Sequence, residues 1–181
     1  MTPTFLRASP DSNAHKAGQL LQASVPVEWP GDATDVLSLR LKQLEAEPAL
    51  QPWLLRAMVL RETDVMVGHI GFHAAPGAAS LGSFSPGAVE FGFTVFPDFR
   101  RQGYAREASL ALMNWARQTH QVTKFVLSIR PDNAASQALA AELGFVRVGS
   151  HLDEVDGLED VLECRASDNE TASGARAANP I

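Results

Sequence analysis

The sequence predicts an α+β fold, a mixed α/β arrangement in which a mostly antiparallel sheet is flanked by helices. Two pairs of extended segments joined by short polar turns predict antiparallel hairpins. A strand also leads directly into a helix, because apolar residues recur at period two over residues 89–96 and at helical spacing over residues 105–118. The hairpins cover residues 54–61 with 65–73, and residues 145–152 with 158–164.

The N-terminal third of the chain predicts one strand and two helices. Residues 3–8 are expected to form a short first strand, and residues 13–23 a helix. A second helix is expected over residues 33–46, where Asp32 or Thr34 is a suitable N-cap. Leucine and valine side chains give this second helix a broad apolar face.

The second strand of the first hairpin contains Gly68 and Gly71, which indicate a bulge or a close approach of another backbone. His69 and His73 share one face of this strand, but about 13 Å of strand rise separates them, too far to share a metal. No metal site is therefore expected. Residues 74–88 are rich in glycine, alanine, serine and proline and are predicted to form a mobile loop.

A basic, glycine-bearing turn, Arg100-Arg101-Gln102-Gly103-Tyr104-Ala105, opens the helix that follows the strand at residues 89–96. The first amides of a helix have no partner within the helix, and the helix dipole adds partial positive charge there. Gly103 lets an anion approach the backbone without an intervening side chain. Together these properties predict a phosphate-binding turn.

Several motifs occur in an order that resembles the GNAT acetyltransferase superfamily. The turn reads Arg100-x-x-Gly103-x-Ala105 and is similar to the pyrophosphate-binding signature R/Q-x-x-G-x-G/A of that family. Downstream, Asn133-Ala134-Ala135-Ser136 and Leu143-Gly144-Phe145 resemble its N-x-x-S and L-G-F segments. The resemblance covers residues 53–165. It is strongest toward the RimJ/RimL-like branch (ribosomal-protein-alanine N-acetyltransferase-like), because the chain also carries Glu90-x-Gly92 and Gly103-Tyr104-Ala105-Arg106-Glu107-Ala108.

The resemblance implies a GNAT-like twisted sheet of about six or seven strands. Residues 89–96 would be strand 4 and residues 125–131 strand 5, with the sheet splayed between them. The implied activity is an N-acetyltransferase that uses acetyl-CoA as cosubstrate and a primary amine as acceptor, either a protein N-terminus or a small molecule. The amine would attack the thioester directly in a ternary complex, which suits a chain without a G-x-S-x-G motif. The alternative is a non-catalytic acyl-CoA-binding or sensor module on the same fold.

The same resemblance assigns residues to the cosubstrate. The backbone amides expected to bind the CoA pyrophosphate are those of Gln102, Gly103, Tyr104 and Ala105. The side chains of Arg100 and Arg101 would add positive charge beside the phosphates. Backbone groups of Phe93 and Val95 would pair with the pantetheine amides as a neighbouring strand does, and one such amide would also donate to the oxyanion.

Glu90 is the candidate general base, because the ammonium form of the acceptor must lose a proton that a carboxylate can take directly or through water. The alternatives are that Glu90 binds the substrate ammonium or pairs with an arginine. Asn133 is expected to hydrogen-bond near the pantetheine or the thioester and also to cap the helix at residues 134–142. Ala140 stands where many relatives carry a tyrosine, so water or Ser136 would protonate the departing thiolate.

Composition limits the remaining possibilities. The 181 residues suit one domain, expected over residues 1–165, with residues 166–181 as a disordered C-terminal tail. The net charge of -6 argues against general nucleic-acid binding, and no apolar stretch is long enough to cross a membrane. Cys164 is the sole cysteine, which fits a reducing, cytoplasmic compartment. The terminal hairpin offers an edge for a homodimer.

Overall fold

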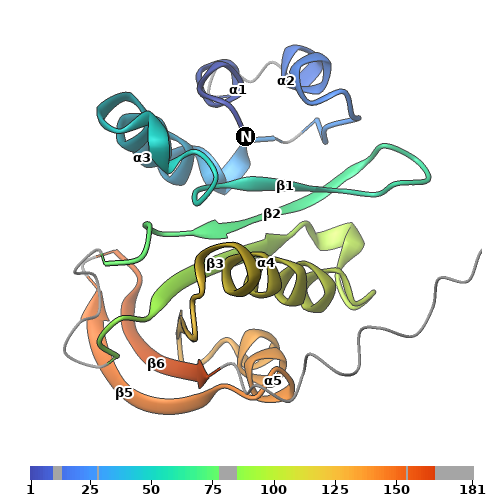
Figure 1. Ribbon diagram of the computed structural model, residues 1–181. Helices are drawn as coiled ribbons and strands as arrows, with labels where there is room; N and C mark the ends of the chain where they lie inside the picture. The colour runs from blue at the N-terminus through green and yellow to red at the C-terminus, as the bar shows by residue number, and fades with distance from the viewer. Residues whose placement is uncertain (10–13, 28, 78–84, 154, 166–181) are drawn as a thin grey trace, which may run out of the picture.

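A computed structural model describes residues 1–9, 14–27, 29–77, 85–153 and 155–165 (Figure 1). Within these ranges the chain forms one six-stranded sheet with the strand order β1-β2-β3-β4-β6-β5. Neighbouring strands pair antiparallel except β3 and β4, which are parallel. The predicted α+β fold with a mostly antiparallel sheet is therefore confirmed. The expected tail at residues 166–181 lies outside the described residues, and the domain boundary at residue 165 stays a prediction.

The elements from residue 33 onward follow the predicted order. The strands are β1 (Arg56–Val59), β2 (Met66–Phe72), β3 (Val89–Val95), β4 (Lys124–Ile129), β5 (Val146–Asp153) and β6 (Gly157–Arg165). The helices are α1 (Pro3–Ala8), α2 (Ala14–Leu21), α3 (Thr34–Ala46), α4 (Tyr104–His120) and α5 (Ala134–Glu142). Three short 3₁₀ turns are η1 (Gly31–Ala33), η2 (Pro48–Leu50) and η3 (Pro97–Phe99).

Residues 3–8 form the helix α1, so the expectation of a first strand was wrong. Thr2 caps this helix, because its Oγ1 accepts a hydrogen bond from the Phe5 N–H at 3.2 Å. Pro3 occupies the first turn, where its missing N–H has no partner to lose. The helix buries the adjacent side chains of Phe5 and Leu6, which a strand would direct to opposite faces. The sheet consequently begins with β1 at its edge.

Helix α3 covers the predicted range, but neither Asp32 nor Thr34 caps it. Ala33 holds the cap position without a side-chain hydrogen bond. The turn η1 precedes the helix and winds directly into it, and the Thr34 hydroxyl donates back to a carbonyl of that turn at 2.9 Å. The buried face is also narrower than predicted, with Leu37 and Leu44 as its buried apolar residues.

Two hydrophobic clusters lie on the two sides of the sheet. One packs α4 against the strands through residues that include Phe91 and Leu112. The other joins the N-terminal helices to the sheet through residues that include Phe5 and Met66. Figure 1 shows the N-terminal helices grouped beyond β1 and α4 lying across the sheet. Odd positions of β3 therefore enter the α4 cluster, and its even positions point to the opposite face.

The two glycines of β2 allow close backbone contacts. A Cβ atom at Gly68 would lie 2.2 Å from Thr94 O, and one at Gly71 would lie 2.7 Å from Leu54 O. The register of β1 against β2 shifts between Met58 and Val59, opposite Gly68. Both features predicted for this strand, the bulge and the close approach, are present.

Strands β3 and β4 pair over only their first residues. The described ladder consists of Val89 with Phe125 and Glu90 with Val126. Strand β2, in contrast, pairs along five residues of β3. Beyond Glu90 the strands β3 and β4 diverge, which is the splay expected between strands 4 and 5.

Backbone groups of β3 face the opening that the splay creates. Glu90 O accepts from the His73 N–H at 2.9 Å, and the Phe96 N–H donates to Val67 O at 2.9 Å. In an antiparallel pair, hydrogen-bonded positions alternate, so the even residues of β3 bond to β2. The N–H and C=O groups of Phe93 and Val95 therefore point away from β2, toward β4.

Candidate active site

A buried carboxylate lies where β3 and β4 begin to separate. Glu90 Oε1 accepts a hydrogen bond from the Ser128 hydroxyl at 2.6 Å, and Glu90 Oε2 lies 3.4 Å from His73 Nδ1. Glu90 pairs with Val126, so Ser128, two residues further along β4, faces the same side of the sheet. Only 10 % of the Glu90 side chain is exposed.

Glu90 is held in its ionised form. Burial raises the pKa of this carboxyl, but the interaction with His73 at ion-pair distance and the hydrogen bond from Ser128 outweigh it. The net result is a pKa below the ordinary value for glutamate. Within the described ranges, the contacts of Glu90 are to a serine and a histidine, and no arginine lies at ion-pair distance from it.

Helix α3 reaches this cluster through a buried arginine. Arg40 is only 7 % exposed, and its Nη1 donates to Gln43 Oε1 at 2.8 Å and to His73 O at 3.0 Å. Gln43 Nε2 also donates to His73 O, at 3.3 Å. Burial lowers the pKa of Arg40, and the charge of Glu90 opposes that effect. The arginine therefore joins α3 to the residue that follows β2 through hydrogen bonds rather than apolar packing.

The last hairpin adds two ionisable side chains on the same face. His151 of β5 pairs with Glu159 of β6, and their Nε2 and Oε2 atoms are 3.4 Å apart, at ion-pair distance without a hydrogen bond. Burial raises the pKa of Glu159, as do the charges of Asp156, Asp153 and Glu90, while His151 lowers it. Two carboxylates, Glu90 and Glu159, thus influence one another across the site.

Sequence reasoning found Glu90 but missed its partners. The sequence excluded a metal shared by His69 and His73, and it gave no catalytic role to His73, Ser128 or Arg40. Arg40 interrupts the leucine face of α3 between Leu37 and Leu44, and this interruption was the available signal. The other partners come together only through strand pairing, which a single sequence does not reveal.

The turn that the sequence predicts to bind phosphate has a left-handed glycine at the start of α4. Gly103 is the N-cap of α4 with φ +87° and ψ -5°, a left-handed conformation that glycine adopts without strain. Gly103 makes no side-chain cap hydrogen bond, and no side chain of the described residues accepts from the first amides of α4, including those of Tyr104 and Ala105. The Gln102 side chain donates to Asp98 O at 3.4 Å, on the outside of the turn. Anion binding by these amides stays a prediction.

The arginines near the turn differ in their contacts. Arg100 Nε donates to Val95 O at 3.1 Å, so it connects the turn to the open side of β3. Arg106 pairs with Glu142 of α5 at 2.7 Å, and Arg101 is exposed. Val95 O accepts from Arg100, so the groups that face the splay without this contact are those of Phe93 and the Val95 N–H.

The start of α5 follows β4 on the far side of the splay. Asn133 Oδ1 accepts from the Ser136 N–H at 3.2 Å, which confirms the N-cap expected for this helix. Ser136 is half-buried, and its hydroxyl role stays a prediction. Ala140 is fully buried in the α4 cluster and supplies no proton donor.

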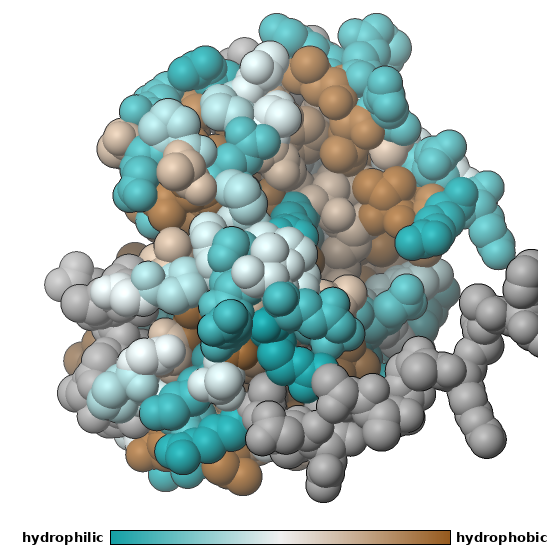
Figure 2. All heavy atoms as spheres, viewed as in Figure 1, coloured by the Kyte–Doolittle hydropathy of each residue, from teal (hydrophilic) through white to brown (hydrophobic). Residues whose placement is uncertain are grey.

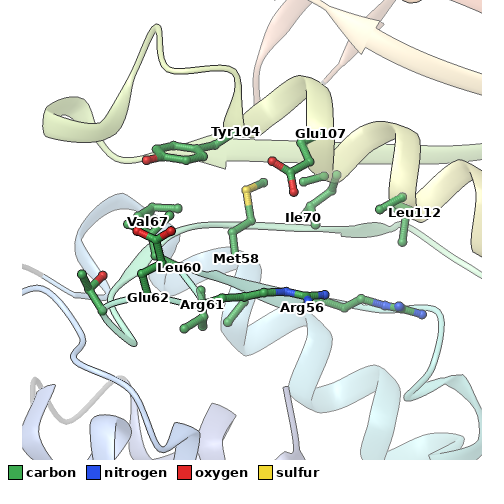
Figure 3. A pocket seen from close by; sticks show the side chains of 15 residues that line it. Arg56, Met58, Leu60, Arg61, Glu62, Val67, Ile70, Tyr104, Glu107 and Leu112 are labelled. Carbon is green, nitrogen blue, oxygen red and sulfur yellow. The ribbon is translucent and has the colours of Figure 1, made fainter. Parts of the chain in front are cut away.

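A cavity of about 560 Å³ lies between the β1–β2 hairpin and α4 (Figure 3). Figure 2 shows hydrophobic atoms exposed in the region between the N-terminal helices and α4. Tyr104 and Glu107 line the cavity from α4, and Met58 and Ile70 line it from the hairpin. Glu90 points to the opposite face of the sheet, so this cavity is separate from the carboxylate cluster.

The described ranges contain neither a candidate metal cluster nor a helix that could span a membrane. There, no three histidine, cysteine, aspartate or glutamate residues lie close enough to hold a metal ion. His69 is buried against Trp29, and burial lowers its pKa to about 4. Among the described residues, no helix combines the length and apolarity required to cross a membrane.

Comparison with known proteins shows which family the chain matches. The family described as Acetyltransferase (GNAT) domain matches residues 7–146. Among curated proteins, the chain is 27 % identical over 136 residues to YjdG of Bacillus subtilis (strain 168), described as an uncharacterized N-acetyltransferase. That match covers 73 % of this chain and 75 % of the relative.

Solved structures share the fold at lower identity. The ribosomal-protein-S5-alanine acetyltransferase of Vibrio fischeri matches with a TM-score of 0.62 and 14 % identity, over 93 % of this chain and 91 % of that one. YncA of Salmonella typhimurium, a putative acetyltransferase solved with acetyl-CoA, matches with a TM-score of 0.54 and 20 % identity. That match covers 80 % of this chain and 78 % of the YncA chain.

Proposed function

Because the chain belongs to the GNAT acetyltransferase family, we propose that it transfers the acetyl group of acetyl-CoA to a primary amine by direct attack in a ternary complex. The observation that carries the proposal is the opening between β3 and β4. An ionised carboxylate, Glu90, lies where the opening begins, and the Gly103 turn follows the end of the same strand. A thioester arm with a pyrophosphate at its end suits these two features.

The cosubstrate would bind along β3. The amides of Gln102, Gly103, Tyr104 and Ala105 would hold the pyrophosphate, with Arg100 and Arg101 adding charge. The backbone of Phe93 and the Val95 N–H would pair with the pantetheine, which carries amides of its own. YncA was solved with acetyl-CoA, which supports this cosubstrate for the shared fold.

Positioning of the two reactants would supply most of the rate acceleration. Holding the amine and the thioester in attack geometry can contribute about 7–11 kcal/mol in favourable cases. A backbone N–H of β3 facing the splay would donate to the oxyanion, an effect worth about 2.7–4 kcal/mol where single donors have been removed. We assign proton removal to the cluster centred on Glu90, contacts of Asn133 to the thioester arm, and protonation of the thiolate to Ser136 or water.

The acceptor would be a protein N-terminus or a small amine. The two carboxylates Glu90 and Glu159 give the site negative charge, which favours a cationic acceptor. The likeness to a ribosomal-protein-S5-alanine acetyltransferase supports a place in the RimJ/RimL-like branch and hence an N-terminal amine. A homodimer through the terminal hairpin and a cytoplasmic location complete the proposal.

A second candidate is a non-catalytic acyl-CoA sensor on the same fold. It is favoured by Ala140, which offers no proton donor to the thiolate from α5. Both candidates require acetyl-CoA to bind, so turnover separates them.

The test is a thiol-release assay with acetyl-CoA against N-terminal peptides, polyamines and aminoglycosides. CoA release that depends on one amine, with the acetylated amine identified by mass spectrometry, is expected. Tight acetyl-CoA binding without release for any amine in the panel would favour the sensor. Absence of acetyl-CoA binding by calorimetry would overturn both candidates.

A further inference from the structure

His73 is held in place on both sides of its main chain. Its N–H donates to Glu90 O at 2.9 Å, and its C=O accepts from Arg40 at 3.0 Å and from Gln43 at 3.3 Å. Arg40 is almost fully buried, so this attachment is shielded from water. The residue directly after β2 is therefore fixed by β3 and by α3.

The imidazole ring of His73 lies over Gly92. A Cβ atom at position 92 would lie 3.1 Å from His73 Nε2, which is tighter than an ordinary contact. Glu90 and Gly92 share one face of β3, so the ring extends over both residues, with Nδ1 toward Glu90 and Nε2 above the glycine. The Glu90-x-Gly92 pattern thus supplies a carboxylate for the ring and the space that the ring needs.

This orientation determines which ring nitrogen carries the hydrogen. Nδ1 lies 3.4 Å from Oε2 of an ionised carboxylate, so a neutral ring places its hydrogen on Nδ1 and keeps the lone pair on Nε2. Within the described part of the chain, Nε2 accepts no hydrogen bond from a protein group. The side chain is 39 % exposed, so a ligand can reach this lone pair.

Glu90 is less accessible to a ligand. One of its oxygens accepts from Ser128 and the other faces His73, and only 10 % of the side chain is exposed. Because so little of the side chain is exposed, an amine has limited access to the remaining lone pairs of the carboxylate. Its lowered pKa also makes it a weak proton acceptor near neutral pH.

We propose that His73 Nε2 is the atom that takes the proton from the acceptor amine, with Glu90 and Ser128 as positioning residues that act through it. The inference rests on the proposed function. The ammonium gives one proton to Nε2, and the free amine attacks the thioester carbon. The C–N bond forms as the C–S bond breaks, the electron pair leaves on the CoA sulfur, and the second proton of the nitrogen reaches the thiolate through Ser136 or water.

Charged groups from four elements belong to the same cluster. Arg40 of α3 interacts with Glu90 of β3, and Glu159 of β6 interacts with Glu90 and with His151 of β5. His151 also interacts with Glu90.

The first experiment measures the tautomer on the full chain, without any acceptor. Long-range ¹H–¹⁵N spectra of ¹⁵N-histidine-labelled protein report which ring nitrogen carries hydrogen, and His73 is assigned from the spectrum of His73→Asn. We expect hydrogen on Nδ1 for His73, with a shift toward the Nε2–H form in Glu90→Gln. A wild-type ring with its hydrogen on Nε2 at high pH would overturn the proposal.

The second experiment measures kcat/KM against pH with the amine found in the thiol-release assay. His73→Asn should lose about 10²- to 10⁴-fold and should lose the acid limb of the profile, while acetyl-CoA affinity stays within about threefold. Glu90→Gln should keep the acid limb, because the proton acceptor in the proposal is His73. The control is His15→Asn, an exposed histidine of α2 outside the site, which should match the wild type.

A chemical rescue separates proton transfer from structural support. Added imidazole should restore activity to His73→Ala in proportion to the neutral imidazole present, which a purely structural role would not produce. If His73→Asn keeps the acid limb and Glu90→Gln loses it, Glu90 is the base and the proposal fails while the proposed function stands. If the wild type acetylates no amine, the proposed function fails first, and the assignment of His73 fails with it.

Discussion

Replacing Gly103 tests the phosphate-binding turn most directly. Its backbone has φ +87°, where an L side chain costs about 1–2 kcal/mol, but a Cβ atom there would meet no neighbour within 4 Å. Gly103→Ala should therefore lose about 1–2 kcal/mol of unfolding free energy and little affinity for acetyl-CoA. If another substitution at position 103 loses more acetyl-CoA affinity than Gly103→Ala does, the additional loss must come from contacts between the new side chain and the ligand.

Gly103→Glu places a carboxylate beside the expected pyrophosphate. Two unit charges about 6 Å apart repel by about 3 kcal/mol at an effective dielectric constant of about 20, before solvent screening. A loss of roughly 100-fold in affinity corresponds to about 2.7 kcal/mol, so Gly103→Glu should weaken acetyl-CoA at least to that extent. Gly103→Gln has the same size without the charge and should lose less than about tenfold.

Isothermal titration calorimetry with acetyl-CoA at two salt concentrations separates these contributions. The difference between the glutamate and glutamine variants should shrink at high salt, because ions screen an exposed charge pair. Thermal unfolding of each variant confirms that it is folded at the titration temperature. Equal affinities for the two variants, at low salt and in folded protein, would refute the phosphate-binding turn.

Three further predictions concern stability. His69 is buried with a pKa lowered to about 4 from 6.5, so below pH 6.5 the unfolded chain binds a proton that the folded chain does not. Stability should fall by about 3 kcal/mol between pH 6.5 and pH 4 through this group, and urea unfolding of His69→Phe should show a flatter dependence over that window. Arg40→Met should lower the free energy of unfolding in urea by about 3 kcal/mol, because it removes the charged donor to His73 O. The control Arg7→Met, at an exposed ion pair, should lower it by less than about 1 kcal/mol. Equal losses in the two variants would argue against a special role for Arg40. Gly68→Ala should lose about 3 kcal/mol or more, because its Cβ would lie 2.2 Å from Thr94 O, and a thermal midpoint within about 2 °C of wild type would contradict that contact.

The fold could be predicted where local signals and topology agree. The hairpins, the strand-to-turn-to-helix segment at residues 89–118 and the Asn133 cap all rest on nearby residues, and each appears in the structure. The prediction of a strand at residues 3–8 failed because a six-residue segment carries too little periodicity to separate helix from strand. The cap of Thr2 was the better signal, since it acts within one turn.

The site could be predicted only in part. Glu90 and the Gly103 turn lie on one continuous segment, so their order along the chain was visible in the sequence. His73 and Ser128 reach Glu90 from the segment after β2 and from β4, and Arg40 of α3 reaches the cluster through the main-chain oxygen of His73. Gly92 was the closest clue, because a glycine two residues from a buried carboxylate on one strand face leaves space for a side chain from elsewhere.

The short β3–β4 ladder divides the sheet into two blocks, β1–β2–β3 and β4–β6–β5, joined across a narrow seam of two residue pairs. Ring contacts such as Phe72 with Phe125 cross the seam, but few backbone hydrogen bonds do. A ligand that bonds along β3 within the opening would act as a brace between the blocks. Binding of such a ligand would then stiffen the whole sheet against shear, and amide hydrogen exchange would become slower in both blocks at once.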